Sequence, residues 1–154
     1  MASSGPSIRV ATETDARAIR ELIRQAQLNP RDLDWRRFLV AEEAGQVVAC
    51  VQVRAHRGGS RELVSAAVER TRRGRGIGRA IAEAAIAREV VRPLYLYTES
   101  GTEVFWAKLG FRAIEGSSVP RDLRMTVLMA RVAAVVFTLV MRRRYRIVTM
   151  QRDG

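Results

Sequence analysis

Apolar residues recur at two spacings along the chain, and stretches of the two kinds alternate from the N-terminus onwards. Ile19, Leu22, Ile23 and Ala26 lie three to four residues apart, which predicts a helix, and the preceding segment 12–15 has capping-box spacing. Between the helical stretches lie short apolar runs that predict strands. The predicted strands are 7–11, 38–41, 46–54, 62–68, 94–98, 111–115 and 132–141.

Glycine and proline residues mark where these elements end. A turn at 43–45 joins the second and third strands, and a second helix over 77–88 stops before Pro93. A short helix over 102–109 ends at Gly110, a residue type that adopts the left-handed conformation after a helix without strain. Because strands and helices alternate, the pattern predicts an α/β or α+β class with a mixed sheet.

One stretch is apolar enough to raise the question of a membrane. Residues 125–141 are apolar except for Thr126, Arg131 and Thr138. A membrane-spanning helix needs about 20 apolar residues without a charge at its centre. Arg131 leaves an unbroken run over 132–141 only, and its β-branched residues favour a buried strand that closes the sheet. The stretch is more apolar than a half-exposed strand needs, so we expect it to pack against another subunit.

The length of 154 residues fits one domain with one core. We expect a flexible start over 1–6, a folded domain over 7–141 and a basic tail over 142–154, whose order the sequence does not decide. The N-terminus lacks the pattern of a signal peptide, so we expect a cytoplasmic protein. The single cysteine, Cys50, lies in the apolar run 47–51 and is expected to be a small buried hydrophobe. It excludes an intramolecular disulfide and a multi-cysteine zinc site, and we expect no metal.

The chain is strongly basic, with a formal net charge of +11. Lys108 is the only lysine, so arginine supplies 26 of the 27 basic residues, a bias that a GC-rich genome would also produce. A basic chain attracts nucleic acids, and it equally attracts small molecules that carry phosphate. The charge alone therefore leaves both kinds of partner open.

The segment 68–79 contains the most informative pattern. An apolar strand runs into Gly74, Gly76 and Gly78, which alternate with arginines, and then into a helix. Glycines leave backbone N–H groups uncovered, the helix N-terminus favours an anion, and arginine side chains suit phosphate geometry. The segment lacks the Lys and Ser or Thr of a P-loop, and its glycine spacing differs from the dinucleotide fingerprint. It predicts a turn that binds a pyrophosphate.

A second motif, Phe105-Trp106-Ala107-Lys108-Leu109-Gly110-Phe111, follows about thirty residues downstream. Together with Arg73-x-x-Gly76-x-Gly78 it strongly resembles the GNAT N-acetyltransferase superfamily, over residues 7–115. The resemblance implies a single domain whose mixed, mostly antiparallel sheet of about six or seven strands is flanked by about four helices. It also implies transfer of the acetyl group of acetyl-CoA to a primary amine by direct attack on the thioester. The pair Phe105-Trp106, with the later Val119-Pro120, resembles the amino-acid and arsenic-resistance N-acetyltransferases, so we expect an amino acid or an analogue as acceptor.

The resemblance also implies roles for particular residues. The cofactor-binding residues would be Val68, Arg73, Gly74, Arg75, Gly76, Ile77, Gly78 and Arg79. The Val68 N–H would polarise the thioester carbonyl. Glu62, six residues earlier, stands where some members of the family have a catalytic glutamate, and it is equally well read as a solvent-facing residue at a strand end. The lone His56, in a polar loop, is expected to be solvated.

Trp106 departs from the family pattern, because many relatives have at this position a tyrosine that protonates the leaving thiolate. An indole N–H does not serve as an acid near neutral pH. Either the thiolate leaves unassisted, or another group such as Tyr97 or Tyr95 on the fifth strand replaces the acid.

We expect a small-molecule amine substrate and a homodimer, without a membrane or nucleic-acid partner. Two alternatives remain: acetylation of a protein or peptide amine, and a non-catalytic module that binds CoA or nucleic acid.

Overall fold

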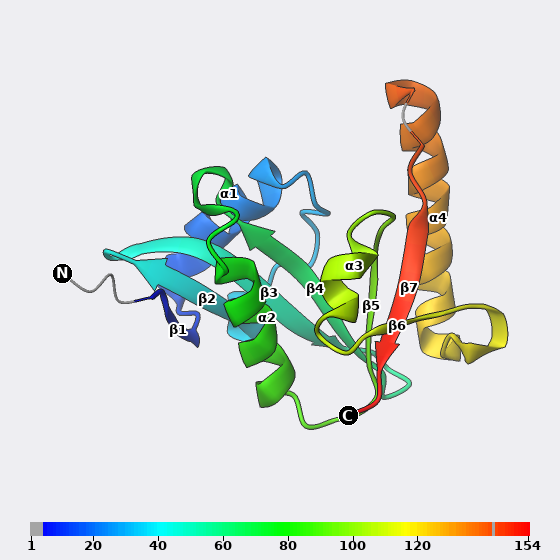
Figure 1. Ribbon diagram of the computed structural model, residues 1–154, viewed down its shortest axis with the longest axis horizontal. Helices are drawn as coiled ribbons and strands as arrows, with labels where there is room; N and C mark the ends of the chain where they lie inside the picture. Colours follow the sequence, from blue (N-terminus) through cyan, green and yellow to red (C-terminus); the bar gives the residue numbers. More distant parts are fainter. Residues whose placement is uncertain (1–4, 143) are drawn as a thin grey trace. The chain divides into compact units, whose positions relative to one another are not determined.

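The structure is a computed structural model, and it describes residues 5–142 and 144–154. Within these residues seven strands and four helices alternate (Figure 1). The strands are β1 (Ser7–Val10), β2 (Phe38–Glu43), β3 (Gln46–Ala55), β4 (Arg61–Val68), β5 (Leu94–Glu99), β6 (Arg112–Ile114) and β7 (Ile147–Arg152). The helices are α1 (Ala16–Gln25), α2 (Ile77–Arg88), α3 (Glu103–Ala107) and α4 (Arg121–Met141). The flexible start expected over 1–6 lies mostly outside the described residues.

The strands form one sheet in the order β1-β2-β3-β4-β5-β7-β6. Strands β1 and β2, β2 and β3, β5 and β7, and β6 and β7 pair antiparallel. Strands β4 and β5 pair parallel, through Arg61 with Leu94 and Glu62 with Tyr95. The expected fold class, a mixed and mostly antiparallel sheet with four helices, is confirmed.

The chain divides into two compact units. The first comprises the residues up to Arg54 together with Leu63–Val90, and the second comprises Ala55–Glu62 together with Val91–Gly154. Strand β4 therefore begins in the second unit and continues in the first.

The core of the first unit forms where α1 covers the N-terminal strands. The predicted stripe of Ile19, Leu22 and Ile23 is buried on one face of α1 and packs with Phe38 and Val40 of β2. The predicted turn between β2 and β3 is also confirmed. In it Ala44 and Gly45 both have positive φ, 50° and 76°, which is the geometry of a tight hairpin.

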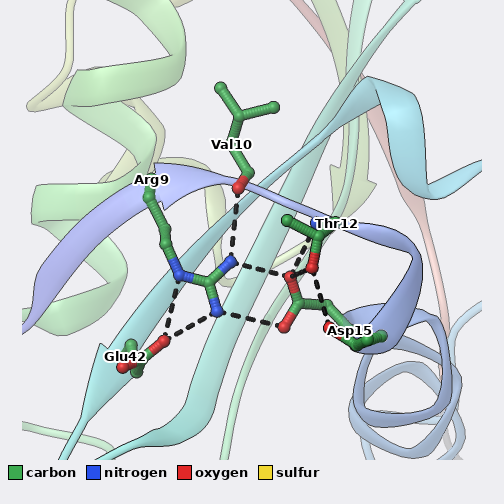
Figure 2. Close-up of polar contacts among 6 residues, drawn as sticks. Arg9, Val10, Thr12, Asp15 and Glu42 are labelled. Atoms are coloured by element: carbon green, nitrogen blue, oxygen red, sulfur yellow. Dashed lines mark hydrogen bonds and ion pairs between the residues drawn. The ribbon is translucent and has the colours of Figure 1, made fainter.

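Arg9 fastens β1 to its neighbours in the first unit (Figure 2). Its guanidinium donates to both carboxylate oxygens of Asp15, at 2.7 and 3.0 Å, and to Oε2 of Glu42, at 2.7 Å from Nη2. Asp15 also accepts from the backbone N–H of Thr12, which completes the predicted capping box. The hydrogen bonds from Arg9 lower the pKa of Asp15 to about 2, although its burial opposes this shift. The cluster joins the edge strand, its partner strand and the start of the first helix.

The second unit has its own core under α4. Tyr95, Ile114, Val119, Leu123 and Val127 are buried together, with Tyr97 packed against them. Strand β7 lies between β5 and β6 and pairs with both.

The prediction that 132–141 is a strand is wrong, because these residues form the C-terminal half of α4. The last strand along the chain is β7, between β5 and β6, and it lies within the segment 142–154 that the sequence left undecided. A β-branched residue in a helix costs only roughly 0.5 kcal/mol, so packing overrides its strand preference. Leu123, Val127 and Ala134 are buried on one face of α4, at spacings that only a helix brings together.

Candidate functional site

The glycine turn connects β4 to α2 within the first unit. Gly74 and Gly76 have φ values of +77° and +81°, a left-handed conformation in which other residues are strained. The Ala80 N–H donates to the Gly76 carbonyl at 3.0 Å and makes the first bond of the helix. The preceding N–H groups at 77–79 consequently have no acceptor within the helix. Residues 73–76 are exposed, whereas Ile77 is buried and anchors the helix start.

The turn packs directly on the end of β4. A Cβ atom at Gly78 would lie 3.3 Å from Cγ2 of Val68, so glycine allows the helix to approach the strand closely. The structure therefore brings together Val68 and the glycine turn, as the sequence motif predicts.

Three predicted arginines of this turn contact their own chain through their side chains. Arg73 Nε donates to the Val68 carbonyl at 3.1 Å, and Arg79 Nε donates to Glu83 at 2.8 Å. Arg75 Nη1 donates to Glu43 at 3.3 Å. Arg75 and Arg79 are thus paired with carboxylates, whereas the Arg73 guanidinium contacts a backbone carbonyl. The binding of a pyrophosphate at this turn stays a prediction.

Strand β4 is irregular between its two ends. Ser65 has φ +58°, outside the extended region, as is typical of a bulge. Its hydroxyl accepts a hydrogen bond from Gln52 Nε2 at 3.1 Å, and its carbonyl accepts from the Cys50 thiol at 3.7 Å. Cys50 is buried, as predicted, and burial raises the pKa of its thiol to about 12. The thiol therefore stays protonated and is not a nucleophile at neutral pH.

Glu62, at the beginning of β4, is buried rather than solvent-facing, with its side chain only 1% exposed. Its Oε2 lies 2.7 Å from Nε2 of His56, which lies in the loop between β3 and β4. Its Oε1 has no hydrogen-bond partner among residues 5–142 and 144–154. The expectation that His56 is a solvated loop residue is wrong, since its side chain is only 13% exposed and contacts Glu62. A buried carboxylate with one oxygen held and the other unpaired is suited to accept a proton.

A third polar side chain, Asp122 in the first turn of α4, fixes the loop that carries His56. It accepts hydrogen bonds from the Ser60 hydroxyl at 2.8 Å and from the Ser60 N–H at 3.2 Å. Burial raises the pKa of Asp122, but the hydrogen bonds from Ser60 outweigh burial, so the pKa is below its usual value. A Cβ atom at Gly58 would lie only 2.6 Å from Asp122 Oδ2, so the loop needs glycine there.

The predicted acids on β5 belong to the core of the second unit. Tyr97 is half-buried against this core and pairs with Thr149 of β7. Tyr95, two residues before it, pairs with Glu62 in the sheet register, and burial raises the pKa of its phenol. Alternation along the strand places the two tyrosines on the same face of the sheet. A catalytic role for Tyr97 stays a prediction.

The Phe105–Phe111 motif is structural in this chain. Trp106 is buried and makes edge-to-face contacts with Phe105 and Phe111, with ring centroids 4.9 and 5.8 Å away. Gly110 has φ +86°, as expected of a residue that ends a helix. Among the described residues no group of three His, Cys, Asp or Glu side chains could hold a metal ion.

Comparison with known structures finds the same fold in several proteins whose structures contain CoA or acetyl-CoA. Rv2747 from Mycobacterium tuberculosis, in complex with CoA and NLQ, has a TM-score of 0.72 and 24% identity, covering 97% of this chain and 99% of that one. N-acetylglutamate synthase from Neisseria gonorrhoeae, complexed with coenzyme A and N-acetyl-glutamate, has a TM-score of 0.77 and 18% identity. It matches over 97% of this chain, which spans only 35% of the synthase chain. A GNAT family acetyltransferase from Brucella melitensis, in complex with acetyl-CoA, has a TM-score of 0.59 and 25% identity, covering 76% of this chain and 92% of that one.

A search of curated protein sequences returns no significant match. A protein-family model described as "Acetyltransferase (GNAT) domain" matches residues 34–113, more than half of the chain, and this range contains the strand β4, the glycine turn and the Phe105–Phe111 motif. The chain therefore belongs to the GNAT acetyltransferase family.

Proposed function

We propose that this N-acetyltransferase transfers the acetyl group of acetyl-CoA to the primary amine of a small molecule, an amino acid or a close analogue. The observation that carries the proposal is the buried pair of Glu62 and His56, 2.7 Å apart. This pair stands at the beginning of β4, and the same strand ends at Val68 in the glycine turn. One strand thus supplies both a proton acceptor and the entry to an anion-binding turn.

The glycine turn supplies the groups that would hold the CoA pyrophosphate. Backbone N–H groups of residues 73–79 donate to the phosphate oxygens, and the side chains of Arg73, Arg75 and Arg79 add positive charge. In this proposal the Val68 N–H donates to the thioester carbonyl oxygen, where negative charge develops as the amine attacks. The two tasks use adjacent backbone, because the turn packs on the end of β4.

Proton transfer is the task of the second group of residues. An amine attacks only when it is neutral, and a free ammonium has a pKa of up to about 10, so a base has to remove its proton. Oε1 of Glu62 accepts this proton, directly or through a water molecule, while His56 holds Oε2. His56 is also partly exposed, so it provides a route by which the proton leaves the buried carboxylate. Tyr97 protonates the leaving thiolate, or the thiolate leaves unassisted.

The proposed acceptor rests on the sequence motifs and on the structural neighbours. The Mycobacterium tuberculosis structure contains NLQ beside CoA, and the Neisseria gonorrhoeae structure contains N-acetyl-glutamate beside coenzyme A. The Neisseria gonorrhoeae structure matches 97% of this chain, so its N-acetyl-glutamate supports an amino acid as acceptor here. We further propose that the enzyme acts in the cytoplasm as a homodimer, without nucleic-acid or membrane partners.

The test is a CoA-release assay with purified protein, acetyl-CoA and a panel of free amino acids, polyamines and short peptides. We expect CoA release with one or a few amino acids, and a kcat/KM at least tenfold above that for any peptide. Binding of acetyl-CoA by calorimetry without release for any amine would support the non-catalytic module instead. A preference for peptides would indicate that the acceptor is a protein or peptide amine. Failure to bind acetyl-CoA would overturn the proposal.

A further inference from the structure

The most unusual surface of the protein is the outer face of α4. Helix α4 has 21 residues, and by length and composition it could cross a membrane, yet only 17% of its most apolar window is buried. One face packs into the core of the second unit through Leu123, Val127 and Ala134. In Figure 1 α4 lies alongside β7 of the same unit.

The far side of α4 is a continuous apolar face. Met125, Leu128, Val132, Val135 and Leu139 follow one another at intervals of three, four, three and four residues. This spacing places them in one row along the helix, as in a helix that packs against another helix. Met129, Val136 and Val140 widen the row. All eight side chains are between 50% and 75% exposed, a patch larger than soluble monomers usually expose.

A helix that is apolar all round is normally buried, either across a membrane or in the core of a larger protein. The connections of α4 exclude the first case. At its first turn Asp122 is bonded to Ser60, and beyond its end Ile147 begins β7, which pairs with β5 and β6. Both ends of α4 thus return to the same folded unit, so the helix cannot cross a bilayer while that unit stays intact.

We propose that the outer face of α4 packs against the same face of a second copy of this chain, in an antiparallel pair around a two-fold axis near Val132. This inference rests on the proposed function, and the helix pair is the interface of the homodimer proposed there. The eight residues of the face carry no charge, so the face is complementary to itself.

The alternating spacing of three and four residues along the row supports a helix as its occupant. Arg131 lies at the margin of the face rather than in its apolar row. Its guanidinium therefore reaches water when the row is covered.

The first test is the mass of the full chain in solution. Sedimentation equilibrium at tens of micromolar should give twice the monomer mass for the natural sequence and for Val90→Glu, the same residue type at a more exposed position outside α4. Val132→Glu should raise the dimer dissociation constant at least tenfold with an unchanged far-UV circular dichroism spectrum. A strict monomer would overturn the proposal. So would a protein that is monomeric in buffer and binds vesicles of phosphatidylcholine and phosphatidylglycerol, since a lipid surface would then be the occupant.

The second test uses cysteine cross-links and keeps the face apolar. Val132→Cys should form a disulfide with its own copy under mild oxidation, because it lies near the axis. Met125→Cys and Leu139→Cys lie seven residues on either side of Val132, so they should cross-link when mixed and not alone. The native Cys50 is buried and does not compete. Cross-linking of Leu139→Cys alone, or of none of these variants, would overturn the antiparallel pair. Acetyl transfer is assayed separately, so loss of the dimer and loss of activity remain distinguishable.

Discussion

Replacing Glu62 by glutamine tests the proposed proton transfer most directly. The glutamine side chain would keep the shape of the buried glutamate, and its amide oxygen would still accept from His56, but it could not take a proton. For an ammonium with a pKa of about 10, only about 0.3% of the amine is neutral at pH 7.5. Without a base the enzyme depends on that fraction, so kcat at pH 7.5 should fall about 300-fold, within the range usual for general bases.

The pH dependence of this loss distinguishes removal of a general base from other causes of low activity. The ratio of natural to variant kcat should shrink about tenfold for each pH unit as the pH rises towards the acceptor pKa. CoA release measured from pH 7 to 10 gives the ratio, and KM for acetyl-CoA should not change. Glu115→Gln is the matched control, because the Glu115 side chain is 77% exposed. A Glu62→Gln variant with a ratio that stays constant with pH, or with nearly full activity at pH 7.5, would refute the assignment of Glu62 as the base.

Two further predictions concern the glycine turn and the Arg9 cluster. Gly76→Val should raise the acetyl-CoA dissociation constant, measured by calorimetry, at least tenfold. The control Gly45→Val has a φ of +76°, close to the +81° of Gly76, but it lies in another turn and should leave the constant unchanged. Equal effects of the two substitutions would indicate general backbone strain. The lowered pKa of Asp15, about 2 against a usual 3.8, stabilises the fold above pH 4, and this contribution of about 2 kcal/mol is lost as the pH falls to 2. Arg9→Gln should remove it, so in urea unfolding the difference between natural and variant protein should shrink as the pH falls from 4 to 2. A difference independent of pH would contradict this account.

The features that sequence reasoning located correctly are set by residues close together in the chain. The capping box at 12–15, the hairpin turn at 43–45 and the glycine turn at 73–79 each depend on a few consecutive residues with particular backbone angles. The family motifs added the order of the elements and the position of Glu62. Local sequence could not show that His56 is buried, because this depends on how the loop returns to β4. The short spacing gave a hint that the two side chains could meet, because His56 and Glu62 flank a short loop. In this loop the His56 N–H donates to the Ser60 carbonyl at 2.9 Å.

Helix α4 shows why a continuous apolar run is ambiguous. The run 132–141 has no polar side to reveal a period, so β-branched composition alone favoured a strand. The helix is fixed earlier in the chain, because Asp122 accepts a hydrogen bond from Ser60 and because Leu123 and Val127 are buried. Once these first turns have formed, the helix propagates into the run 132–141. The same first turn holds the loop of His56. Helix α4 thus has two proposed roles: its first turn supports the proposed proton-transfer residues, and its apolar outer face is the surface that we propose packs against a second copy.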